Sequence, residues 1–98
     1  MARRLRVSAA AARDVERIAL YSRQRWGVAV AVRYVVGLDA AMRKLRRLPL
    51  LESNYGEVIP GVRRYHYRSH FLYYVVSDDS VRIVRILHVR MSPTRHLP

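Results

Sequence analysis

The sequence contains no cysteine, which excludes disulfide bonds, thiolate nucleophiles and zinc sites of the cysteine type. It has no apolar run that approaches the roughly 20 residues of a membrane-spanning helix, and its basic start is not followed by the apolar segment of a secretion signal. Acidic residues are also scarce, with seven Asp and Glu against nineteen Lys and Arg. We therefore expect a cytoplasmic protein without a membrane segment.

The excess of cations gives a net charge of +12, and Lys44 is the single lysine among them. The other cations are arginines, whose planar guanidinium groups bind carboxylates and phosphates through paired hydrogen bonds. This charge predicts an anionic partner: a nucleic acid, an acidic protein segment or an anionic membrane. Because 51% of the 98 residues are hydrophobic, we expect one domain over residues 1–98 with a single core.

Two helices are predicted in the first half of the chain. Ser8 is a candidate N-cap for a helix over 9–25, which Gly27 ends by adopting a left-handed C-cap conformation. A second helix follows from about 28 and ends at Pro49. The apolar residues at helical spacing predict buried faces made of Ala11, Val15, Ile18, Ser22 and Trp26 in the first helix, and of Ala31, Tyr34, Val35, Leu38, Met42, Leu45 and Leu48 in the second.

Strands are predicted on both sides of these helices. Residues 3–8 alternate as a short strand, and the period returns to two over 62–68, 70–76 and 81–90, after a loop over 49–61. The aromatic residues of these strands are predicted to cover the helices, and Trp26 to pack as an anchor. The order β-α-α-β-β-β predicts an α+β fold, with an N-terminal helical hairpin packed on a mostly antiparallel four-stranded sheet.

Candidate functional residues gather on the last predicted strand. Arg85, His88 and Arg90 lie close together there, and Arg64 and His66 are expected on a neighbouring strand. They form either a basic contact site, or a structural set in which His88 bonds the C-terminal tail and the arginines pair with Glu52, Glu57 or Asp79. No carboxylate pair, Ser/His/Asp set or metal-ligand cluster competes with them, so we expect no cofactor and no metal.

Several stretches match a known family in order and spacing. They are Val7-Ser8-Ala9-Ala10-Ala11, Tyr21 with Arg25-Trp26-Gly27, Ile59-Pro60-Gly61-Val62-Arg63-Arg64, the run from Ile83 to Met91, and Arg95-His96-Leu97. On these residues the chain resembles the ParE branch of the RelE/ParE toxins, the toxin halves of bacterial type II toxin–antitoxin pairs. The resemblance implies the same β-α-α-β-β-β fold, growth arrest through DNA gyrase, and silencing by an antitoxin encoded beside the toxin. It also implies a hetero-oligomer that meets operator DNA only through the antitoxin.

Two positions depart from the RelE branch, whose members cleave mRNA on the ribosome. RelE-like chains have an arginine before the apolar residues of the middle strand and a tyrosine that closes the tail, where this chain has Phe71 and Leu97. Both departures point away from nuclease chemistry, and the Leu-His-x-Arg-Met ending is ParE-like, although Ser92 stands where many ParE chains have an acid. The alternative is a ribosome-dependent endoribonuclease that uses His88, His96 and Arg85. A nucleic-acid-binding module without toxicity is a third possibility.

The resemblance and the charge together predict a toxin that acts through a binding surface and has no catalytic site. The expected target contacts are Arg64, Arg85, His88, Arg90, Met91, Arg95 and His96, and the expected antitoxin contacts are Arg43, Arg46, Arg47, Arg64 and Arg68. An acidic antitoxin segment would lie in a groove beside the helical hairpin or add to a sheet edge, and its binding would weaken as salt rises.

Overall fold

The computed structural model describes residues 3–50 and 59–97, and its elements follow the predicted order. They are β1 (Arg4–Val7), α1 (Ala9–Trp26), α2 (Val28–Arg47), β2 (Arg63–Tyr67), β3 (His70–Val76), β4 (Ser80–His88) and α3 (Pro93–His96). The α+β prediction is confirmed, and only the single turn of α3 was not expected. In the described ranges no helix is both long enough and apolar enough to cross a membrane.

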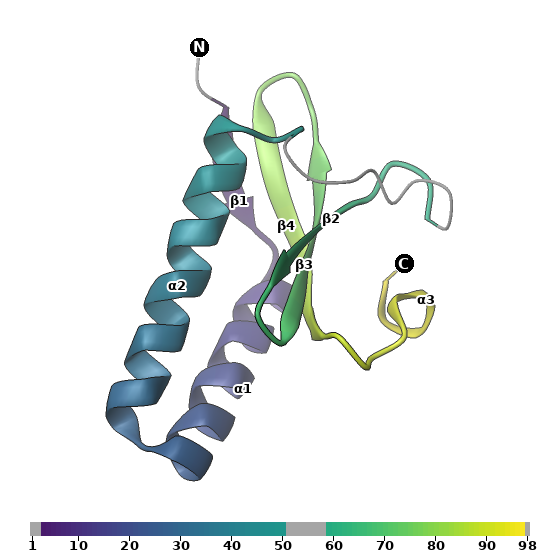
Figure 1. Cartoon of the computed structure of the whole chain (residues 1–98). Coiled ribbons are helices and arrows are strands. Elements are labelled where there is room, and N and C mark those ends of the chain that lie inside the picture. The colour runs from purple at the N-terminus through teal and green to yellow at the C-terminus, as the bar shows by residue number, and fades with distance from the viewer. Residues whose placement is uncertain (1–2, 51–58, 98) are drawn as a thin grey trace.

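The four strands form one sheet in the order β1-β4-β3-β2. The β2–β3 and β3–β4 pairs are antiparallel, whereas β1 pairs with β4 in parallel, so the sheet is mostly antiparallel as predicted. Helices α1 and α2 cover one face of the sheet, and α3 lies on the opposite side (Figure 1). Strand β4 ends two residues before the predicted limit because the amide of Met91 turns back to the carbonyl of His88, 2.9 Å away.

The helical hairpin depends on a cap at each end of α1. The Ser8 hydroxyl accepts a hydrogen bond from the Ala11 amide at 3.0 Å, which confirms the predicted N-cap. Gly27 has φ 92° and ψ 171°, an extended backbone with positive φ that is essentially restricted to glycine. The predicted left-handed C-cap conformation is therefore wrong in ψ, because this one residue must end α1 and also direct the chain into α2.

The main core lies between the two helices and the sheet. Leu38 and Leu45 of α2 pack there with Leu72 of β3 and Ile83 of β4, and all four are fully buried. The predicted helical faces are mostly confirmed, but Trp26 is 56% exposed and Leu48 is 52% exposed. Trp26 is the last residue of α1, at the tip of the hairpin that extends beyond the sheet (Figure 1), and Leu48 follows the last residue of α2.

A second, smaller core lies on the other face of the sheet. Val62, Tyr73, Leu87 and Leu97 are buried in it, with Phe71 packed against them. Tyr65, Tyr67 and Tyr74 do pack toward the helices as predicted, whereas Phe71 and Tyr73 do not. The strand period explains this correction, because alternate residues of β3 must point to opposite faces.

A β-bulge interrupts the alternation of β4, a strand that is apolar on both faces because each face borders a core. Tyr74 pairs with Ile83 but Tyr73 pairs with Arg85, so Val84 is an extra residue in the strand. Beyond the end of β1, β4 has no described strand beside it on that edge, and Ser8 and α1 provide hydrogen-bond partners for its backbone. The Ser8 hydroxyl donates to the Val84 carbonyl at 2.7 Å, and the Ile86 amide donates to Asp14 at 2.9 Å.

Gly37 allows Tyr67 to approach the backbone of α2. A Cβ atom at this position would lie 1.7 Å from Oη and 2.6 Å from Cζ of Tyr67. Gly37→Ala is expected to lower the free energy of unfolding by about 1–2 kcal/mol, because crowding outweighs the gain in helix propensity. Urea unfolding measures the change.

The same substitution in a Tyr67→Leu background provides the control. With the end of the ring removed, Gly37→Ala should be neutral or stabilising there, because only the propensity gain of at most about 1 kcal/mol remains. An equal loss in both backgrounds would show that contact with Tyr67 is not the cause.

Candidate functional site

Five of the predicted target contacts lie together after the end of β4, and we call them the tail surface: His88, Arg90, Met91, Arg95 and His96. His88 ends β4, Arg90 and Met91 lie in the turn that follows, and α3 carries Arg95 and His96. The imidazole Nδ1 of His88 accepts from the Arg90 amide at 3.1 Å and so fixes this turn. Arg90, Met91 and Arg95 are exposed to solvent, and a partner could therefore reach them.

Arg85 is held inside the protein by Asp14 of α1. Its Nε and one terminal nitrogen donate to the two Asp14 oxygens at 2.8 and 2.9 Å, and both side chains are largely buried. The other terminal nitrogen donates to the carbonyl of His96 at 2.9 Å. This bonding to Asp14 raises the pKa of the Arg85 guanidinium. Arg85 therefore positions the tail, and its acidic partner is Asp14.

The observed contacts of His88 also differ from the structural role that the sequence suggested. The sequence interpretation had His88 bonding the tail, but Arg85 makes that bond and His88 bonds its own turn. Of the predicted acidic partners, Asp79 accepts from the Ser77 hydroxyl, and Glu52 and Glu57 lie outside the described residues.

Arg64 is separated from the tail surface by a whole strand. It lies on β2, and β3 stands between β2 and β4, so the expected neighbouring strand is not adjacent. The Arg64 guanidinium lies 4.0 Å from the centre of the Phe71 ring. His66, on the same strand, contacts the Arg68 carbonyl through Nε2 at 2.5 Å and packs near Phe71. These two residues therefore belong to the β2 edge.

His70 forms a cluster with Tyr34 and His88 on the helix side of the sheet. The Tyr34 hydroxyl lies 2.6 Å from Nδ1 of His70 and accepts from the Ser69 amide at 3.3 Å. Burial, with the nearby His88 as a smaller cause, lowers the pKa of His70 to about 4. Burial also raises the pKa of Tyr34. At neutral pH we therefore assign a neutral imidazole that accepts from the Tyr34 hydroxyl.

This cluster predicts a loss of stability in acid. An unfolded histidine has a pKa near 6.5 and folded His70 has one of about 4, so the unfolded state binds more protons between these values. The contribution of His70 is therefore present above pH 6.5 and lost as the pH falls toward about 4. Because the ring is only half-buried, we expect a loss of about 1–2 kcal/mol.

The measurement is the free energy of unfolding by urea across this range, for the wild type and for His70→Gln. The variant should be less sensitive to pH than the wild type. His66→Gln, which alters an exposed histidine of the same hairpin, serves as the control. If His70→Gln keeps the full wild-type slope, the acid sensitivity comes from other groups.

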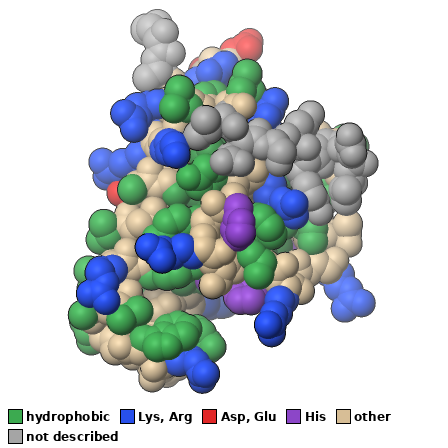
Figure 2. Space-filling model, viewed as in Figure 1, with side chains coloured by type: hydrophobic (Ala, Val, Ile, Leu, Met, Phe, Trp, Pro, Cys, Tyr) green, Lys and Arg blue, Asp and Glu red, His purple; other side chains and the backbone are tan. Residues whose placement is uncertain are grey.

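The predicted antitoxin contacts lie in three places, the two ends of α2 and, for Arg64, the β2 edge. Arg43, Arg46 and Arg47 lie in its last two turns, and the nearby Asp39 forms an exposed ion pair with Arg43 at 2.9 Å. Arg68 lies in the β2–β3 turn, beside the first turns of α2. Figure 2 shows that Lys and Arg side chains spread over the visible face, where acidic side chains are sparse.

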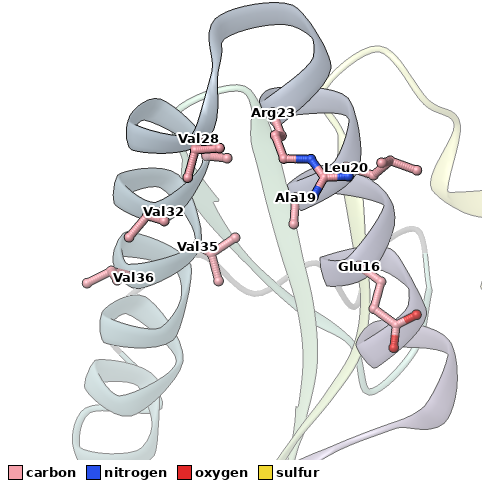
Figure 3. Close-up of a pocket in the computed structure, with 9 residues that line it drawn as sticks. Glu16, Ala19, Leu20, Arg23, Val28, Val32, Val35 and Val36 are labelled. Carbon is pink, nitrogen blue, oxygen red and sulfur yellow. The ribbon is translucent and has the colours of Figure 1, made fainter.

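Sequence reasoning expected a groove beside the helical hairpin but did not name the residues of the apolar groove on its outer face, which we call the hairpin groove. It has a volume of about 540 Å³ and lies between α1 and α2 (Figure 3). Val28, Val32 and Val36 are each more than half exposed, and Leu20 of α1 is 47% exposed. The signal was present, because these valines recur every four residues beside the buried face of α2. The residues that line the groove are Glu16, Ala19, Leu20, Arg23, Val28, Ala31, Val32, Val35 and Val36.

The comparisons with known proteins agree with one another. Residues 5–93 match the family model described as the ParE toxin of the type II toxin–antitoxin system parDE. The protein called Toxin ParE1 of Mycobacterium tuberculosis is 34% identical over 98 residues, which are 99% of this chain and all of that protein. Toxin ParE1 of Caulobacter vibrioides is 35% identical over 92 residues, covering 94% of this chain and 95% of the relative. The chain belongs to the ParE toxin family.

A solved structure supports the fold of this ParE-family toxin. The chromosomal ParDE toxin–antitoxin system from P. aeruginosa contains a chain that superimposes with a TM-score of 0.80 at 20% identity, covering 90% of this chain and 97% of that one. The predicted resemblance to the ParE branch is therefore confirmed, and this chain is a ParE-type toxin of a type II toxin–antitoxin system.

The two positions that depart from the RelE pattern both pack against the second core of this ParE-type toxin. Phe71 lies between His66 and the Arg64 guanidinium on the outer face of the sheet. Leu97 is 9% exposed and closes the same core. In the described part of the chain, no three His, Asp or Glu side chains converge to hold a metal ion.

Proposed function

We propose that this ParE-type toxin inhibits DNA gyrase in the cytoplasm by binding it through the tail surface, without catalysing a reaction of its own. The observation that carries the proposal is the arrangement around Arg85. Asp14 and the His96 carbonyl occupy its guanidinium, and this fixes a tail on which Arg90 and Arg95 are exposed. An exposed pair of arginines on a fixed tail is suited to contact with a protein or with the DNA that gyrase holds.

The endoribonuclease alternative would need Arg85 on the scissile phosphate. Its guanidinium is instead engaged by a buried carboxylate, and Nδ1 of His88 is bonded to the Arg90 amide. No contact in the described residues favours that chemistry, so it enters only as an outcome of the test.

We further propose that the antitoxin is an acidic protein that places an amphipathic segment in the hairpin groove. The groove is apolar along α2, and Arg43, Arg46 and Arg47 extend beyond its end. An apolar segment with acidic flanks would cover the exposed valines and also reduce the repulsion within a chain of net charge +12.

The test measures supercoiling of relaxed plasmid DNA by gyrase and ATP in the presence of the full-length toxin. The wild type should block supercoiling or accumulate cleaved plasmid. The double variant Arg90→Ala and Arg95→Ala should need a concentration about tenfold higher, because such anchor residues are typically worth more than about 1.4 kcal/mol. Arg82→Ala, which removes an exposed arginine of β4, should behave as the wild type.

Other outcomes contradict specific parts of the proposal. Equal weakening by Arg82→Ala would show that only net charge matters. Unaffected supercoiling by a folded protein that stops growth would reject gyrase as the target, and cleavage of mRNA on ribosomes would then identify the enzyme. Val32→Glu, placed in the hairpin groove, should still inhibit gyrase but should resist neutralisation by the antitoxin. If this variant is neutralised normally, the groove is not the antitoxin site.

A further inference from the structure

Another hollow lies where the end of α1, the start of α2 and the β2–β3 turn meet, and we call it the hinge pocket. Its volume is about 440 Å³, which is in the range of small-molecule sites, about 300–1,000 Å³. It is separate from the tail surface and from the hairpin groove. Its lining includes Trp26, Arg33, Tyr34, Tyr67, Arg68 and Ser69.

The pocket offers aromatic surface to a flat ligand. Trp26 is 56% exposed, and its ring and that of Tyr21 meet in a T-shaped contact at 5.7 Å between centroids. On the opposite wall, Tyr34 and Tyr67 meet edge to face at 5.3 Å. Exposed aromatic faces held in this way are the surfaces on which nucleic-acid bases stack.

The pocket also offers positive charge. Arg33 and Arg68 are exposed on its rim, neither forms an ion pair with a described residue, and no acidic side chain lines it. Guanidinium groups favour a phosphate because they form charge-assisted hydrogen bonds with its oxygens.

The rim is held in place before any ligand arrives. Arg68 has a left-handed backbone with φ 50°, and its carbonyl contacts His66. The amide of the next residue, Ser69, donates to the Tyr34 hydroxyl at the floor of the pocket. The turn that carries Arg68 is therefore bonded directly to the helix that carries Arg33.

We propose that the hinge pocket binds a nucleotide, with the base against Trp26 and the phosphate between Arg33 and Arg68. The aromatic wall and the paired cations match the two halves of this ligand, and a peptide carboxylate would use only the cations. A free nucleotide and one unit of a single DNA strand share this chemistry. The assignment is independent of the gyrase proposal, because it uses no residue of the tail surface.

The fluorescence of Trp26 reports binding directly, because the full chain has no other tryptophan. The probes are ATP, inorganic triphosphate, adenosine and a short oligothymidylate. We expect saturable quenching by ATP, with much weaker effects of triphosphate, which lacks the base, and of adenosine, which lacks the phosphate. Tighter binding of the oligothymidylate than of ATP would assign the site to a DNA strand, and the reverse order to a free nucleotide.

Two rim variants and one distant variant complete the test. Arg33→Gln and Arg68→Asn should each raise the dissociation constant for the tighter probe about tenfold, through the loss of a charge-assisted hydrogen bond. Asparagine is chosen at position 68 because it tolerates positive φ. Arg82→Gln, with the same loss of charge on β4, should change binding less than about twofold, and unchanged urea midpoints show that all variants are folded.

Three results would overturn the proposal. If inorganic triphosphate binds as tightly as ATP, the base makes no contribution and the site is only an anion contact. Equal weakening by Arg82→Gln would show non-specific attraction to a basic protein. Absence of quenching by both ATP and the oligothymidylate would show that Trp26 does not receive a base.

Discussion

Replacing Asp14 by alanine is expected to lower the free energy of unfolding by about 3–5 kcal/mol, because it leaves the Arg85 guanidinium largely buried without its counter-ion. The Asp14 carboxylate accepts from two nitrogens of Arg85 and from the Ile86 amide. The substitution therefore also removes the acceptor of a buried backbone amide next to the β-bulge. Since a domain of this size is stable by only about 5–15 kcal/mol, the variant should be close to unfolding at 25 °C. Urea unfolding measures the loss.

Asp39→Ala is the matched control for this prediction. Asp39 also pairs with an arginine, Arg43, but both side chains are more than half exposed and lie one helical turn apart. We expect a loss of about 0.5 kcal/mol or less. Adding Arg85→Met to Asp14→Ala should restore part of the stability, because no buried charge then remains unpaired. A loss below about 1 kcal/mol for Asp14→Ala would mean that water solvates Arg85 in the folded protein.

Leu97→Ala is expected to release the tail and to cost about 2–4 kcal/mol, the range for a buried leucine that leaves a cavity. Leu97 packs against Val62, Tyr73 and Leu87 across the outer face of the sheet. The Arg85 bond to the His96 carbonyl, the backbone of α3 and the bonds that His88 makes in its own turn would then hold the tail surface. If the tail surface contacts the target, inhibition should fall with the release of the tail.

Hydrogen exchange of the α3 amides separates these two effects. The Arg95 and Leu97 amides donate to the carbonyls of Ser92 and Pro93, and in Leu97→Ala their exchange should accelerate by a larger factor than that of the β3 amides. Met91→Ala removes an exposed side chain from the same surface and should leave the exchange unchanged. Full inhibition by a variant with a released tail would place the target contact elsewhere.

Local signals were sufficient to predict the secondary structure of this chain. The Ser8 cap, the single Gly27 between two helices and Pro49 after α2 act within one helical turn of themselves, so they can be recognised without knowledge of the fold. The alternation in 70–76 likewise predicted β3 with its observed ends. The bulge at Val84 was not predictable, because the Val84 carbonyl bonds Ser8 at the other end of the chain. The turn at Met91 closes on His88 only three residues away, but the strand pattern that continues to Arg90 concealed it.

The candidate site could likewise be predicted from the sequence only in part. The exposed positions of Arg90 and Arg95 follow from their place after the last strand, but their roles in target binding stay predictions. The Asp14–Arg85 pair joins residues 71 positions apart, and nothing near either residue indicates the other. The hairpin groove was predictable in principle, since Val28, Val32 and Val36 lie on one line of α2, but the buried face of the same helix dominated the pattern.

The parallel pairing of β1 with β4 has a consequence for the synthesis of this protein. Residues 4–7 bond to residues 80–83, so the first strand that the ribosome makes must wait for the last one. Most of the chain is translated at about 5–20 residues per second before β1 gains its partner and Asp14 meets Arg85. We therefore expect the nascent chain to lack its complete sheet until β4 has left the ribosome.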